Sequence, residues 1–123
     1  MKKVLVADDK DTGRELVRTV LENNYEVFEA ANGVEALEQA RRVHPDLIIL
    51  DLHMPGLDGF GVMQELRRDQ TLAGTPVMAL TASAMMGDRE RALSAGFTGY
   101  IAKPIRLSAL RAEVERLLKS TAC

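Results

Sequence analysis

Short apolar runs alternate along the chain with longer segments in which apolar residues recur at every third or fourth position. A run of four or five apolar residues is typical of a strand buried on both faces, as in a parallel sheet. The stretch Glu26–Ala30 is more polar than the others, which is expected near a sheet edge. The pattern predicts strands at residues 4–7, 26–30, 47–50, 76–80 and 98–102.

The segments between these runs have the spacing of amphipathic helices. Thr12 with Glu15, and Asn32 with Glu35, have the capping-box pattern that marks a helix start. Each helix should turn one apolar stripe toward the sheet. The expected stripes are Leu16, Val17, Val20 and Leu21; Ala36, Leu37, Ala40 and Val43; and Leu107, Leu110, Val114, Leu117 and Leu118.

Two further helices are predicted at about residues 60–68 and 85–95, and a last one follows Pro104. Gly96 is placed to end the helix over 85–95. Five strand–helix units joined by right-handed crossovers make an α/β fold with a doubly wound parallel sheet. We therefore expect a single domain over residues 1–123, without an effector domain.

Bulk composition narrows the class of function. Of the 123 residues, 46% are hydrophobic and 28% are charged, and the formal net charge is −2. This charge provides no general attraction to nucleic acid or to an anionic membrane, and no apolar stretch is long enough to span a bilayer. The start of the chain lacks a secretory pattern, and its single cysteine, Cys123, cannot form an internal disulfide. We expect a cytoplasmic protein.

Carboxylates gather at the carboxyl end of the predicted sheet. Asp8 and Asp9 follow the first strand, and Asp51 ends the third. Open α/β sheets bind their ligands at this edge. Carboxylates that converge there repel one another, and a hard divalent cation is the economical way to compensate them. Thr81 and Lys103 follow the fourth and fifth strands, so that both should reach the same place.

Taken in order, these residues resemble the receiver domain of two-component response regulators, in its CheY-like single-domain form. The matching pieces are Asp8-Asp9, Asp51-Leu-His-Met-Pro-Gly-Leu-Asp-Gly59, Thr81-Ala-Ser and Lys103-Pro104, and the resemblance covers essentially the whole chain. Each piece alone is weak evidence for the family. Together they are strong evidence, because they occur in the family's order and each one closes a predicted strand. The resemblance implies a flavodoxin-like fold with five helices and a five-stranded sheet of order 2-1-3-4-5.

The resemblance also implies a phosphoacceptor and a metal site. Asp51 would accept a phosphoryl group from a phosphohistidine on a partner. Mg²⁺ would be the cofactor, held directly by Asp9 and Asp51 and largely through water by Asp8. The backbone carbonyl of His53 would supply a further oxygen ligand. Phosphoryl transfer depends mainly on positioning and charge neutralisation, which this set of groups can provide.

Three further positions carry roles implied by the resemblance. Lys103 would place its charge against the phosphoryl oxygens, and the Thr81 hydroxyl would donate a hydrogen bond to them. The family holds the Lys103–Pro104 peptide bond in cis. Tyr100 matches the family's switch aromatic, whose rotamer couples to Thr81; its other interpretation is a partly buried strand tyrosine that only packs.

The expected partners are proteins. A histidine kinase or a histidine phosphotransfer protein would act upstream. A downstream target would bind the face made by the helix over 85–95, the strand over 98–102 and the last helix. The protein would be a monomer or a phosphorylation-promoted dimer, and its only chemistry would be self-catalysed phosphoryl acceptance and autodephosphorylation.

Other classes of function are less consistent with the sequence. A flavodoxin-type electron carrier would need a phosphate loop where this chain has Asp8-Asp-Lys-Asp11, which repels a flavin phosphate. An aspartate-nucleophile phosphatase of the haloacid dehalogenase type is the enzymatic alternative. Asp9-Lys-Asp11 resembles its paired aspartates but lacks the following hydroxyl residue, and there is no room for a cap domain.

Two alternatives remain for the kind of protein in which this receiver acts. The start at Met1 and the short tail favour a freestanding regulator, and the end of the chain near residue 123 argues against a DNA-binding domain. A receiver domain of a hybrid histidine kinase, or a phosphorelay intermediate, is the other alternative. Lys10 departs from the family pattern, which more often has a neutral or acidic residue there; its side chain is expected to reach solvent or to weaken metal binding.

Overall fold

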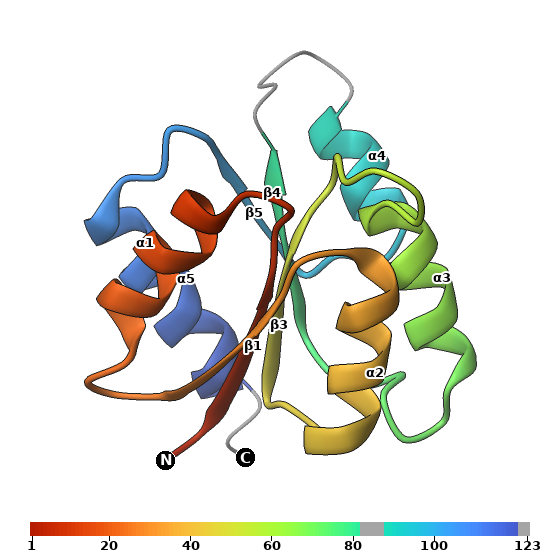
Figure 1. Cartoon of the computed structure of the whole chain (residues 1–123), viewed down its shortest axis with the longest axis horizontal. Helices are drawn as coiled ribbons and strands as arrows, with labels where there is room; N and C mark the ends of the chain where they lie inside the picture. Colours follow the sequence, from red (N-terminus) through yellow and green to blue (C-terminus); the bar gives the residue numbers. More distant parts are fainter. Residues whose placement is uncertain (82–87, 121–123) are drawn as a thin grey trace.

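The apolar runs form one parallel sheet in a computed structural model, which describes residues 1–81 and 88–120 (Figure 1). Within these residues the sheet has five strands in the order β2-β1-β3-β4-β5. This order confirms the flavodoxin-like fold that the resemblance implies. The strands are β1 (Lys3–Ala7), β2 (Glu26–Ala30), β3 (Leu47–Asp51), β4 (Val77–Thr81) and β5 (Gly99–Ala102).

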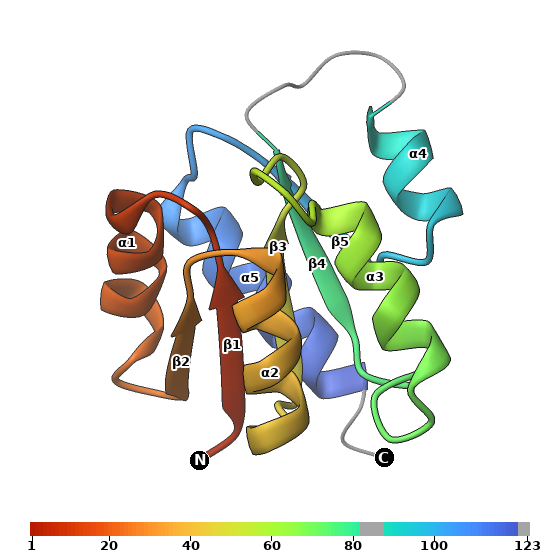
Figure 2. The same cartoon turned by 45° about the vertical axis from the view of Figure 1, so that its right-hand side comes forward.

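Helices cover both faces of the sheet. Figures 1 and 2 show α1 and α5 together on one face, and α2, α3 and α4 on the other. In the described ranges, no helix combines the length and the apolar content that crossing a bilayer requires. The helices are α1 (Asp11–Leu21), α2 (Gly33–Val43), α3 (Gly59–Arg68), α4 (Asp88–Ser94) and α5 (Leu107–Ser120).

Burial on both faces explains why the central strands are apolar throughout. Along β3, Ile48 and Leu50 pack toward α2 and α3, whereas Leu47 and Ile49 pack toward α1 and α5. Every residue of β3 and β4 is buried, including Asp51 and Thr81 at their carboxyl ends. The edge strand β2 begins with an exposed residue and is only partly buried along most of its length, as its polarity predicts.

The two predicted capping boxes have different outcomes. At α2 the prediction is confirmed: Asn32 Oδ1 accepts a hydrogen bond from the Glu35 amide (2.9 Å), and Glu35 Oε1 accepts one from the Ala31 amide (3.0 Å). At α1 it is wrong, because the helix begins at Asp11, before Thr12. The N-cap is Lys10, whose side chain makes no capping hydrogen bond among the described residues.

The predicted apolar stripes are confirmed at every position except Leu16 and Leu107. Leu16 is 37% exposed and Leu107 is 46% exposed, whereas the other members of the three stripes are buried. Leu107 is the first residue of α5, whereas Leu16 lies in the middle of α1. The predicted start of the helix over 85–95, and Ser83, lie outside the described residues. That helix ends at Ser94, one residue earlier than predicted, and Gly96 follows with a positive φ of 101°.

Arg67 joins two loops at the amino-terminal end of the sheet. Its guanidinium donates to the carbonyl oxygens of Ala73 (2.8 Å) and Thr75 (3.2 Å) before β4, and of Gly96 (2.9 Å) after α4. Burial lowers the pKa of this guanidinium. The fork of donors thereby satisfies backbone acceptors from two segments that are distant in sequence.

We predict that Arg67→Met lowers the free energy of unfolding by about 1–3 kcal/mol, because the carbonyls lose a charged donor. Arg68→Met is the matched control: the Arg68 side chain is 74% exposed and pairs only with Glu65 among the described residues. Its stability should stay close to that of the parent. Urea unfolding of the three proteins measures the difference. Equal stability of the two variants would contradict this role of Arg67.

Candidate functional site

The carboxyl ends of neighbouring strands bring the predicted site residues together. Asp51 and Thr81 are the last residues of β3 and β4, while Asp8 directly follows β1 and Lys103 directly follows β5. These four strands are adjacent in the order β1-β3-β4-β5. Because they are parallel, their polar ends lie at one edge of the sheet, near the arrowheads in Figure 2.

One lysine bridges two buried carboxylates at this edge. Lys103 Nζ donates to Asp8 Oδ2 and to Asp51 Oδ2, both at 3.0 Å. Asp8 is fully buried and Asp51 is only 4% exposed. The sequence indicated that Lys103 would approach Asp51, but it did not indicate the contact with Asp8. In this structure, therefore, an ammonium group compensates the charge for which the sequence predicted a divalent cation.

Backbone amides hold the other oxygen of each carboxylate. Asp51 Oδ1 accepts a hydrogen bond from the His53 amide (2.9 Å), and Asp8 Oδ1 accepts one from the Lys10 amide (3.0 Å). Each carboxylate thus has one oxygen fixed by its own loop and the other directed toward Lys103. These hydrogen bonds fix the orientation of both groups.

The two carboxyl groups differ in how readily they carry a charge. Burial raises the pKa of Asp51, and together with the charge of Asp8 it outweighs the hydrogen bonds from His53 and Lys103. Burial also acts on Asp8, but there the Lys10 amide and Lys103 outweigh it and lower the pKa. Although burial alone would lower the pKa of Lys103, the two carboxylates raise it. The Asp51 carboxyl group is therefore harder to ionise than that of Asp8.

The carboxylates also fit a divalent cation. One oxygen from each of Asp8, Asp9 and Asp51 lies within 4.8 Å of the others, and this is the only such acidic cluster among the described residues. Asp9 is exposed, so that the cluster opens to solvent on one side. Oxygen donors in this number suit Mg²⁺, which keeps several waters and binds through a few carboxylates.

Two glycines lie close to the aspartates of the site, one against a side chain and one against the backbone. A Cβ atom at Gly13, in the first turn of α1, would overlap Asp8 Oδ2. A Cβ atom at Gly59, the first residue of α3, would lie 2.6 Å from the carbonyl oxygen of Asp51. Gly13 could not be predicted from the sequence, because a glycine inside a helical pattern does not reveal which side chain it faces.

The other predicted residues lie on the β4–β5 side of the site. Thr81 is fully buried, and its carbonyl oxygen accepts a hydrogen bond from the Lys103 amide (2.6 Å). The Lys103–Pro104 peptide bond is cis. Tyr100 is half-buried on β5, where its amide donates to Glu113 Oε2 (3.4 Å).

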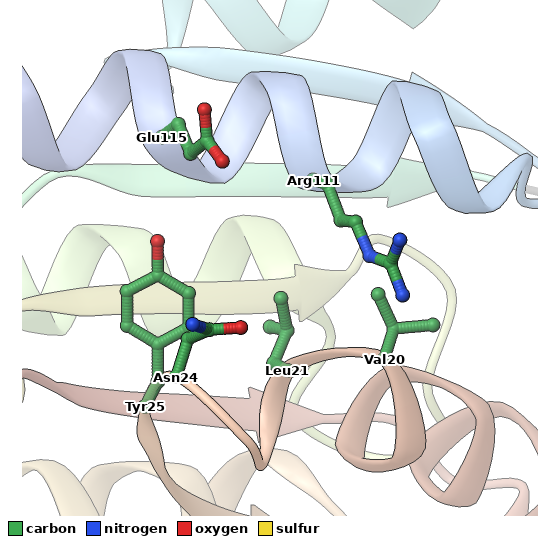
Figure 3. Close-up of a pocket in the computed structure, with 6 residues that line it drawn as sticks. All are labelled: Val20, Leu21, Asn24, Tyr25, Arg111 and Glu115. Carbon is green, nitrogen blue, oxygen red and sulfur yellow. The ribbon is translucent and has the colours of Figure 1, made fainter.

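One hollow in the surface adjoins the site, and another lies away from it. A hollow of about 320 Å³ adjoins Lys103 and is lined also by Gly13, Leu16 and Pro104. Figure 3 shows another, of about 310 Å³, between α1 and α5. There Arg111 and Glu115 extend from α5 toward Val20, Leu21, Asn24 and Tyr25 (Figure 3). This second hollow contains none of the predicted site residues.

Comparison with known proteins identifies the family. Residues 4–115 match the sequence model of the response regulator receiver domain. The chain is 41% identical over 105 residues to the polar-differentiation response regulator DivK of Brucella ovis, a match that covers 85% of each chain.

Solved structures agree with this match. The chemotaxis protein CheY4 of Vibrio cholerae is 33% identical, with a TM-score of 0.90 over 95% of this chain and 98% of that one. The receiver domain of a signal transduction histidine kinase from Syntrophus aciditrophicus is 32% identical, with a TM-score of 0.89 over 99% of this chain and 93% of that one. Fold, motifs and matches together show that the chain belongs to the response regulator receiver domains of two-component signalling.

Proposed function

We propose that this receiver takes a phosphoryl group onto Asp51 from a phosphohistidine of a histidine kinase or a histidine phosphotransfer protein. The observation that carries the proposal is the contact of Lys103 Nζ with Asp51 Oδ2 at 3.0 Å, beside the oxygens of Asp8 and Asp9. A nucleophile, a positive charge and a set of metal-binding oxygens are the parts that phosphoryl transfer requires.

The transfer makes a P–O bond to a carboxylate oxygen of Asp51 and breaks the P–N bond of the phosphohistidine. The leaving imidazole keeps the bonding pair and takes up a proton. Both the attacking carboxylate and the phosphoryl group are negative, so that the site must supply positive charge and fixed geometry. Lys103 supplies charge, and the hydrogen bond from the His53 amide keeps the carboxylate in place.

Mg²⁺ is the proposed cofactor, and Asp8, Asp9 and Asp51, with the backbone carbonyl of His53, would hold it. When bound, it neutralises charge on the transferring phosphoryl group. The Thr81 hydroxyl is proposed to donate a hydrogen bond to a phosphoryl oxygen, since Thr81 ends the strand next to the one that carries Asp51.

The same contacts argue against the phosphatase alternative. A phosphatase of that kind would use an aspartate directly after the first strand, in the Asp9-Lys-Asp11 segment. Here the side chain of Asp11 is 89% exposed and Asp9 is also exposed, whereas Asp51 is buried against a lysine. We propose a cytoplasmic response regulator. The receiver domain of a hybrid histidine kinase, or a phosphorelay intermediate, is the alternative context.

We predict that incubation with an acyl phosphate and Mg²⁺ adds one base-labile phosphoryl group to the parent protein and none to Asp51→Asn. Asp69→Asn is the matched control, since it removes a carboxylate at the end of α3 that lies outside the cluster. Mass spectrometry of the intact proteins, with and without EDTA, measures the adduct. Its persistence in Asp51→Asn would disprove the assignment.

The face formed by α4, β5 and α5 is the proposed output surface. A hollow of about 370 Å³ there is lined by residues of all three elements, among them Arg89, Leu93, Tyr100 and Arg116. Leu93 is 51% exposed. An exposed leucine beside cationic side chains is suited to bind a downstream protein or a second copy of this chain.

Helix α4 buries few of the side chains that the structure describes. Ala92 is its buried apolar residue, and Arg91 lies over the ring of Phe60 on α3 at 4.1 Å from the ring centroid. Few buried contacts allow a segment to change position at low free-energy cost. An aspartyl phosphate brings about two negative charges to the edge. We propose that Thr81 moves toward them, and that the ring of Tyr100 turns into the space vacated beneath α4.

We predict that Thr81→Ala still accepts a phosphoryl group but loses most of the response at the output surface. The reason is that phosphorylation shifts the population only through contacts that differ between the two states. Thr71→Ala is the control, because Thr71 is exposed and its hydroxyl bonds to Asp69. Amide chemical shifts with and without an acyl-phosphate mimic measure the response. A parent protein in which Tyr100 and α4 stay unchanged would contradict this switch.

A further inference from the structure

Arg14 is an unusually buried cation close to the carboxylates of the site. It lies in the first turn of α1, and its side chain is only 13% exposed. Arginine is rarely buried to this degree without partners that satisfy its donors.

The guanidinium of Arg14 connects three segments. Its Nη1 donates to the backbone carbonyl of Asp8 at 2.6 Å. Its Nε donates to Glu29 Oε1 on β2 at 3.3 Å, and its Nη2 pairs with Asp11. The end of β1, the neighbouring strand and the start of α1 are thus joined through one rigid, planar group.

The Asp8 carbonyl is an informative acceptor because it belongs to the peptide unit between Asp8 and Asp9. That unit is planar, so a hydrogen bond that fixes its oxygen also fixes its orientation. The orientation determines the directions in which both side chains leave the backbone. A donor on this carbonyl therefore controls the placement of two of the three clustered carboxylates.

The charge of Arg14 is largely balanced where it lies. Glu29 and Asp11 both contact the guanidinium, so that its net field at the carboxylate cluster is small. A bare positive charge would weaken cation binding, whereas a neutralised one that orients the loop would strengthen it. The geometry of the contacts favours the second effect.

Arg18, one turn further along α1, differs from Arg14 in one important respect. It pairs with the same acid, Glu29 (3.0 Å), and with Glu22 (3.8 Å), and its side chain is 44% exposed. Among the described residues, none of the hydrogen bonds and ion pairs of Arg18 reaches Asp8. It therefore provides a matched control of the same residue type and partner.

We propose that Arg14 is a positioning residue that holds the Asp8–Asp9 peptide unit and thereby keeps the metal-binding carboxylates gathered in the metal-free protein. The proposal rests on the proposed function only in taking Mg²⁺ as the cation. Because the loop is organised in advance, Mg²⁺ binds without first having to order it. Arg14 contacts the backbone of one proposed ligand residue and none of the carboxylates of the cluster.

The experiment compares Arg14→Gln, Arg14→Lys and Arg18→Gln with the parent chain. Amide chemical shifts followed during a Mg²⁺ titration give the affinity, which should fall about tenfold in Arg14→Gln. Arg14→Lys keeps the charge but not the planar fork, so its affinity should fall as well. Arg18→Gln should stay within about twofold of the parent. An Arg14→Gln affinity equal to or tighter than that of the parent, or an Arg14→Lys affinity equal to it, would overturn the proposal.

A second readout needs no metal. In the structure, the amides of Asp8 and Lys10 donate to Ala30 O (3.1 Å) and Asp8 Oδ1 (3.0 Å). These hydrogen bonds should protect both amides from hydrogen exchange in EDTA. Their exchange should be faster in Arg14→Gln than in Arg18→Gln. Equal exchange in the two variants would refute the positioning role. If the parent fails to bind Mg²⁺, the proposed cofactor is wrong, and exchange alone decides the role of Arg14.

Discussion

The structure depends on the pairing of two buried carboxylates with one ammonium group at the carboxyl edge of the sheet. Asp8 and Asp51 are almost fully buried, and each lies 3.0 Å from Lys103 Nζ. Burying a charge is unfavourable unless it is paired, so the fold tolerates these carboxylates only while a cation is present. A metal ion or a phosphoryl group entering the site alters this balance. The proposed cation binding and phosphorylation would therefore be coupled to folding through the same few atoms.

The pairing also ties the site to the whole sheet. Lys103 is 95 residues from Asp8 and 52 residues from Asp51 in sequence, and it reaches them only because β1, β3, β4 and β5 are neighbours. The amide of the same lysine donates to the carbonyl of Thr81. Lys103 thus connects Asp51 to β4. Because Lys103 directly follows β5, it also connects Asp51 to the proposed output surface.

Much of the fold and of the site could be predicted from the sequence, because strands buried on both faces are apolar throughout and the carboxyl ends of parallel strands meet at one edge. The positions of Asp8, Asp51, Thr81 and Lys103 follow from those rules together with the family resemblance. The bridge from Lys103 to Asp8 could not be predicted, since residue order does not determine distances between side chains. The cap expected at Thr12 was wrong because local propensity is a weak guide where α1 starts directly beyond the site loop.

The most direct test of this account is a double-mutant cycle between Lys103 and Asp51 in metal-free buffer. The unfolding free energies of the parent, Lys103→Met, Asp51→Asn and the double variant give the coupling energy between the two side chains. If the lysine compensates buried negative charge, Lys103→Met should be much less destabilising when Asp51 is already neutral, with a coupling of roughly 1–3 kcal/mol. Strictly additive effects would show that the two groups do not depend on each other, and would contradict the account.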